Sequence, residues 1–138
     1  MTSATLLHRW PIRIYYEDTD GGGVVYHSNY LNFMERARTE FLRSLGFQQT
    51  LLRSEQGIIF VVREIGLKYI RPARFDDKLE IVTELTGTGR SLLQFRQTIM
   101  RGNELLTEAQ VEVVCVDAQR FKPVAIPPTI RETIMEHK

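Results

Sequence analysis

One amphipathic stretch constrains the fold of this 138-residue chain more than any other segment. From residue 28 onward, apolar residues recur at i, i+3, i+4, i+7, i+11 and i+15, which is the spacing of one face of a helix. Ser28 suits the N-cap and Gly46 the C′ position. The pattern therefore predicts one long helix with a single apolar stripe, formed by Tyr30, Phe33, Met34, Ala37, Phe41 and Leu45.

The rest of the chain reads mainly as strands. Residues 9–16 alternate and are rich in β-branched and aromatic side chains, and four further strands are predicted over 58–70, 78–86, 92–101 and 104–117. Gly66 is interpreted as a β-bulge. Residues 47–56 are interpreted as a short helix or structured loop, and the last ten residues as a short terminal helix. An antiparallel sheet wrapped around the long helix buries its stripe, which predicts an α+β fold in one domain over residues 1–138.

Such a sheet leaves a second face and two edges. We expect apolar residues on the second face to need a cover and the edge strands to need protection, so the sequence predicts a homo-oligomer.

Composition and charge exclude several classes of function. The chain has 18 Lys and Arg against 17 Asp and Glu, a net charge of +1, which gives no electrostatic reason to expect a nucleic acid partner. Cys115 is the only cysteine, so no intrachain disulfide forms, which fits a reducing compartment. The first residues lack a sustained apolar segment, and no later stretch reaches membrane-spanning length. We expect a cytoplasmic protein.

An acidic, glycine-rich run lies between the first strand and the long helix. It contains Asp18, Asp20 and three consecutive glycines, and His27 follows it. The first backbone N–H groups of a helix lack intrahelical partners and can polarise a carbonyl. A carboxylate beside them can attack that carbonyl or activate water, so the residue types favour acyl transfer or hydrolysis. On residue types alone, a solvated helix-capping turn explains the run equally well.

Other chemistries do not fit this run. An EF-hand reading that starts at Asp18 places Gly22 and Asn29 at ligand positions five and twelve. Tyr26 stands where a dinucleotide-binding motif needs its third glycine, and the chain contains no G-x-S-x-G. His8 and His137 lie near the termini without clustered ligands. We therefore expect neither a metal nor an organic cofactor.

The remaining polar candidates have structural interpretations. Cys115 is predicted to be a small buried hydrophobe, because no neighbour would stabilise a thiolate. Glu35 and Glu40 are predicted to form surface pairs with Arg38 and Arg43 at i, i+3 spacing.

The run from residue 15 to 46, YYEDTDGGGVVYHSNYLNFMERARTEFLRSLG, resembles the signature of hotdog-fold acyl-CoA thioesterases of the 4-hydroxybenzoyl-CoA thioesterase family. It is most similar to the Tol-Pal-associated (YbgC-type) branch. RWPIRIYYEDTD, FVVREIGLKYIRPARFDDKLEI and VEVVCVD resemble the same family, so the resemblance covers nearly the whole chain. It implies a hotdog fold, a homodimer or homotetramer, and an active site at the dimer interface beside the helix N-terminus.

The resemblance also implies roles for particular residues. Asp20, the second aspartate of D-T-D, matches the family's catalytic aspartate, as nucleophile or general base. His27 and Tyr16 match residues that accompany it in this branch, although an aromatic in a predicted strand usually belongs to the core. Backbone N–H groups near Tyr26 and His27 would hold the thioester oxygen. Another hotdog branch places a glutamate in the helix, but the loop aspartate fits this sequence better.

The implied reaction converts an acyl-CoA thioester to a free acid and CoA. Arg63, Lys68, Arg71 and Arg74 are candidate contacts for the CoA phosphates, although solvated side chains are the commoner explanation for such residues. Acyl carrier protein is a second candidate partner. The alternative function is a non-catalytic module that binds acyl-CoA or acyl carrier protein. A hotdog dehydratase is a further alternative, but the chain offers no suitable acid–base pair for it.

Overall fold

The computed structural model describes residues 6–136, so His137 lies outside the described residues. Five strands form one antiparallel sheet in the order β1-β3-β4-β5-β2. This order puts β1 and β2 at the two edges, although they flank the long helix in sequence. The strands are β1 (Leu6–Arg13), β2 (Ile58–Tyr69), β3 (Lys78–Thr88), β4 (Leu92–Arg101) and β5 (Glu104–Asp117).

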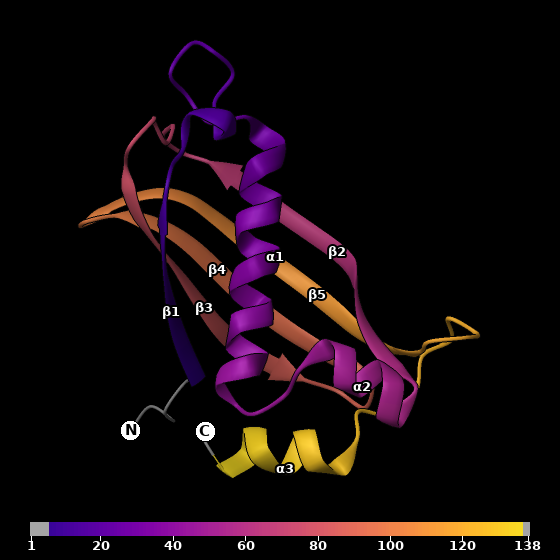
Figure 1. Ribbon diagram of the computed structural model, residues 1–138. Coiled ribbons are helices and arrows are strands. Elements are labelled where there is room, and N and C mark those ends of the chain that lie inside the picture. Colours follow the sequence, from indigo (N-terminus) through magenta and orange to yellow (C-terminus); the bar gives the residue numbers. More distant parts are fainter. Residues whose placement is uncertain (1–5, 137–138) are drawn as a thin grey trace.

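The long helix, α1 (His27–Ser44), lies along one face of the sheet (Figure 1). The glycine loop projects at its N-terminal end, whereas α2 (Gln49–Gln56) and α3 (Pro128–Glu136) lie at the other end. The predicted α+β architecture is confirmed, as are the short helix after α1 and the terminal helix. No helix within residues 6–136 is both long and apolar enough to cross a membrane.

Burial of the predicted stripe holds α1 against the sheet. Its side chains from Tyr30 to Phe41 are at most 3% exposed, and Leu42 is buried as well. Each large apolar side chain buried in this way stabilises the fold by about 1.5–3 kcal/mol. The C-terminus of α1 is a Schellman motif, in which the Phe47 N–H donates to Leu42 O at 2.9 Å and Gly46 adopts φ 95°. Gly46 thus occupies the predicted C′ position.

Three local predictions are wrong. The helix begins at His27 with Tyr26 as N-cap, so Ser28 lies inside its first turn. β1 ends at Arg13, and Tyr16 begins a 3-10 turn, η1 (Tyr16–Asp18). There Tyr16 is 69% exposed and is no part of the core. The irregularity in β2 lies between Val62 and Glu64, whereas the predicted bulge, Gly66, pairs regularly with Gln110.

The face of the sheet opposite α1 carries ion pairs. Arg96 Nη2 lies 2.6 Å from Glu108 Oε2, and the same guanidinium approaches Glu84 at 3.8 Å. Arg9 pairs with Glu80 at 2.9 Å. These charged side chains pair with one another across the strands of this face.

A polar network lies between α1 and the sheet. Gln97 is fully buried and donates to Met34 O and Thr83 Oγ1, each at 3.0 Å, while its own oxygen accepts from Arg38 Nη1 at 2.9 Å. Burial lowers the pKa of Arg38, an effect that the charge of Glu35 opposes. The predicted Glu35–Arg38 surface pair is wrong, because Arg38 turns towards the sheet.

Two other side-chain predictions are confirmed. Arg43 pairs with Glu40 on the surface of α1. Cys115 is fully buried, and burial raises the pKa of its thiol to about 11.

Candidate active site

The three glycines form the tip of a tight loop. Thr19 and Val25 make an antiparallel bridge at its base, and the Asp20 N–H donates to Val24 O at 3.0 Å. Gly21 and Gly23 adopt φ 87° and 91°, the left-handed region that glycine enters without steric cost. Gly21 and Gly23 are therefore needed for the backbone path that leads into α1.

The segment after β2 holds this loop in place. The Val25 N–H donates to Ala73 O at 3.0 Å, and Val24 bridges to Arg74. The Ala73 N–H donates in turn to the hydroxyl of buried Tyr30 at 2.9 Å. The entry to α1 thus depends on residues far along the sequence.

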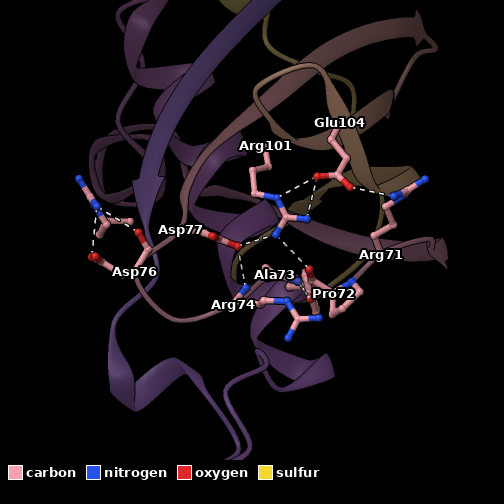
Figure 2. Close-up of polar contacts among 10 residues, drawn as sticks. Arg71, Pro72, Ala73, Arg74, Asp76, Asp77, Arg101 and Glu104 are labelled. Atoms are coloured by element: carbon pink, nitrogen blue, oxygen red, sulfur yellow. Dashed lines mark hydrogen bonds and ion pairs between the residues drawn. The ribbon is translucent and has the colours of Figure 1, made fainter.

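Arg101 anchors that segment from β4 (Figure 2). It donates to Asp77 Oδ2 at 2.7 Å and to Glu104 Oε1 at 2.8 Å, while Glu104 Oε2 accepts from Arg71 at 3.0 Å. Asp77 Oδ2 also accepts from the Arg74 N–H at 2.8 Å. The hydrogen bonds to Glu104 and Asp77 raise the pKa of Arg101, and the bond with Arg101 lowers the pKa of Glu104.

The two aspartates of the run occupy different environments. Asp18 Oδ2 accepts from the Tyr15 N–H at 2.9 Å, and Asp18 Oδ1 accepts from Asn29 Nδ2 at 3.1 Å. The Asp18 carbonyl accepts from the Tyr26 N–H at 3.1 Å. Both carboxylate oxygens of Asp18 therefore hold η1 and the start of α1 together.

Asp20 keeps one carboxylate oxygen available. Its side chain is exposed, and its Oδ1 accepts from the Gly22 N–H at 2.7 Å. No partner for Oδ2 is found within residues 6–136. An anion with a free oxygen thus lies on the loop that leads into the helix.

The N-terminus of α1 has free donors. Its N-cap, Tyr26, provides no side-chain hydrogen bond, and no acceptor within the described residues faces the N–H groups of His27 and Ser28. The Tyr26 N–H already donates to Asp18, so of the two expected backbone donors only that of His27 is free, and Ser28 supplies another. The positive end of the helix dipole adds to these donors.

The structure does not join the three predicted side chains by direct contacts. The exposed His27 ring stacks on Tyr69, with centroids 4.4 Å apart and planes at 19°. Tyr16 meets Phe75 edge-on at 6.0 Å. Sequence reasoning missed Tyr69 and Phe75. The alternation of the 58–70 segment was the available signal for Tyr69, since it shares a strand face with Leu67.

The four basic side chains proposed as contacts for the CoA phosphates also differ in their surroundings. Arg63 pairs with Glu112 at 3.1 Å, and Arg71 pairs with Glu104. Lys68 and the guanidinium of Arg74 have no acidic partner within the described part of the chain. No cluster of three or more metal-ligating side chains occurs there either.

Comparison with known proteins defines the class. The thioesterase superfamily matches residues 22–108, and the chain belongs to this family, an enzyme class with the hotdog fold. It is 54% identical over 127 residues to the acyl-CoA thioester hydrolase YbgC of Escherichia coli O6:H1, covering 91% of this chain and 94% of that protein. It is 47% identical to the acyl-CoA thioesterase YbgC of Haemophilus influenzae, covering 88% and 90%.

A solved structure agrees with these relatives. The probable thioesterase from Bartonella henselae superposes with a TM-score of 0.84 at 40% identity, covering 88% of this chain and 99% of that one. The family and the hotdog fold that the run over residues 15–46 predicted are confirmed.

Proposed function

We propose that this protein hydrolyses acyl-CoA thioesters to a free carboxylic acid and CoA. The observation that carries the proposal is the exposed Asp20 carboxylate, with one unpartnered oxygen, on the loop that enters the uncapped N-terminus of α1. The YbgC relatives bear the names of acyl-CoA thioesterases, which supports the substrate class.

The backbone would act on the thioester oxygen. As the carbonyl carbon becomes tetrahedral, negative charge develops on its oxygen, and the N–H groups of His27 and Ser28 would stabilise that charge together with the helix dipole. The Tyr26 N–H would contribute only by leaving Asp18. Preoriented donors of this kind typically contribute about 2.7–4 kcal/mol each to lowering the barrier.

Asp20 would act on the carbonyl carbon by one of two routes. In the first, its free oxygen attacks, the C–S bond breaks, CoA leaves as a thiolate that takes a proton, and water cleaves the mixed anhydride. In the second, Asp20 takes a proton from water as the water attacks, and that proton passes to the departing thiolate. His27 would orient the water or move the proton, and Tyr16 would border the site.

Among the four basic candidates, Lys68 and Arg74 suit the CoA phosphates best, because Arg63 and Arg71 already pair with carboxylates. Arg74 also adjoins the glycine loop through its bridge to Val24. Acyl carrier protein presents the same thioester and is a second proposed acyl donor.

We further propose a homodimer or homotetramer that associates through β2. This strand is an edge of the sheet, and its apolar Val62 is 45% exposed. The free thiol of Cys115 suits a reducing cytoplasm, and the resemblance to the Tol-Pal-associated branch suggests work beside the cell envelope.

Thiol release from a panel of acyl-CoA esters, short to long and aromatic, tests the function. Asp20→Asn preserves the size of the side chain and removes its charge, and we expect kcat to fall by about a thousandfold or more with fold and oligomer intact. Asp76→Asn is the matched control, because Asp76 is an exposed carboxylate that pairs with Arg13 outside the site.

Two results would reject parts of the proposal. Wild-type turnover by Asp20→Asn would remove Asp20 from the chemistry. Binding of acyl-CoA without release of CoA by the wild-type protein would favour the non-catalytic binding module.

A further inference from the structure

Tyr69, the last residue of β2, contacts the first turn of α1 in two ways. Its ring stacks on the ring of His27, with centroids 4.4 Å apart, and its hydroxyl donates to the His27 carbonyl at 3.1 Å. A strand at the edge of the sheet is thereby joined to the residue at which the helix begins.

The orientation of the His27 side chain depends on this contact. His27 is exposed, and the stack on Tyr69 is the only ring contact or hydrogen bond of its imidazole within residues 6–136. An exposed side chain without such a contact exchanges between staggered rotamers on the picosecond-to-nanosecond timescale. A parallel aromatic neighbour selects one orientation.

A buried side chain supports Tyr69 from the core. Its ring meets the buried Tyr30 ring edge-on, with centroids 5.2 Å apart. Tyr30 accepts the Ala73 N–H, so the three aromatic rings link α1 to both the end of β2 and the segment that follows. Burial raises the pKa of Tyr69, with a smaller contribution from Tyr30.

Packing alone does not account for these contacts. Tyr69 is 43% exposed, whereas Tyr30 beside it is 2% exposed and belongs to the core. The hydroxyl of Tyr69 could bond to water at this surface but donates instead to a carbonyl in the first turn of the helix. The hydroxyl thus adds to the attachment of Tyr69 to α1, whereas the ring is the part of the side chain that faces the His27 imidazole.

We propose that Tyr69 is a positioning residue for thioester hydrolysis, whose ring holds the His27 imidazole in the orientation used at the N-terminus of α1. The inference rests on the function proposed above. In this proposal, a residue of β2 supports the His27 ring, and Tyr69 itself makes no contact with the reacting atoms.

Three variants test this role. Tyr69→Leu removes the stack, Tyr69→Phe keeps the ring and removes only the hydroxyl, and Phe121→Leu is the control at an exposed aromatic beyond the other end of the β2–β5 pair. For each we would measure kcat, KM and the ring-proton chemical shifts of His27. These shifts report the ring current of a stacked neighbour whether or not the enzyme turns over.

We expect Tyr69→Leu to lower kcat by about ten- to a hundredfold and to abolish the ring-current shift of His27, because small misplacements at a site cost that much. KM should change by less than about twofold, since ground-state binding is untouched. Tyr69→Phe should retain the shift and most of kcat, which also separates positioning from a failure to fold. Phe121→Leu should match the wild type.

A double-mutant cycle identifies the residue through which Tyr69 acts. In a His27→Ala background, Tyr69→Leu should cause little further loss of kcat, because the ring that it positions is absent. Fully additive losses would overturn the proposal, as would a normal kcat in Tyr69→Leu or equal losses in the Leu and Phe variants. If the wild-type protein hydrolyses no thioester, the proposed function fails, and an unshifted His27 ring in the wild type would reject the stack independently.

Discussion

Gly22 offers a way to move the Asp20 carboxylate without changing its chemistry. A Cβ added at Gly22 would lie 3.1 Å from Asp20 Oδ1, which is closer than the two atoms normally approach. Gly21, the preceding residue, provides the opposite perturbation. A Cβ there meets no atom within 4 Å, but the residue adopts φ 87°, which strains any side chain.

The two alanine variants should therefore separate activity from stability. In Gly21→Ala, left-handed backbone costs about 1–2 kcal/mol, partly offset by about 0.4–1 kcal/mol from the stiffer unfolded chain. In Gly22→Ala, the same offset applies without backbone strain, and the exposed Asp20 side chain turns away at a cost of about 0.5–1.5 kcal/mol. The free energy of unfolding should fall in Gly21→Ala and change little in Gly22→Ala.

The activity should depend on the position of the Asp20 carboxylate. Displacing Oδ1 disturbs its hydrogen bond from the Gly22 N–H, so Gly22→Ala should lose about tenfold in kcat, equivalent to about 1.4 kcal/mol. Urea unfolding followed by circular dichroism, together with thiol release from one acyl-CoA, measures both quantities. Wild-type kcat in Gly22→Ala would refute the claim that the hydrogen-bonded position of Asp20 matters for the reaction.

Two further predictions concern the core. Gln97→Leu should lower the free energy of unfolding by about 2–4 kcal/mol, since it leaves Arg38 and the buried Thr83 hydroxyl without their partner. Gln94→Leu is the control, because Gln94 lies at an exposed position on the same strand. An equal loss of stability in Gln94→Leu would show that the buried hydrogen bonds are not the cause. The Cys115 thiol has a pKa raised by burial from 9.0 to about 11, so the unfolded chain loses this proton at lower pH than the folded one. The stability of the wild type relative to Cys115→Ala should therefore be constant below pH 9 and decline towards pH 11 in urea titrations, and a difference independent of pH would count against burial as the cause.

The sequence was sufficient to predict the architecture, because helices and strands are recognised from repeats among residues that are close in sequence. The apolar spacing of α1 and the alternation of β4 and β5 depend on the helical and strand repeats, and the observed bounds of both strands equal the predicted ones. Tyr16 shows the limit of such patterns. Its apolar neighbours continue the strand alternation, but the chain leaves the sheet at Arg13 and turns into η1.

The candidate site was only partly accessible from the sequence. Residue types identified Asp18, Asp20 and His27 as candidate site residues but did not show which aspartate is catalytic. The family resemblance selected Asp20. The contacts supply a physical difference between them, because Tyr15 and Asn29 occupy both oxygens of Asp18 whereas Asp20 keeps one available.

By itself, the sequence determined that one long helix would pack on an antiparallel sheet and that an acidic glycine loop would precede it. Only the tertiary structure decided what surrounds that loop. Tyr69, Ala73 and Arg101 reach it because strands distant in sequence pair in a particular register. Periodicity specifies which face a residue occupies, but the identity of its neighbours depends on how the faces pack together.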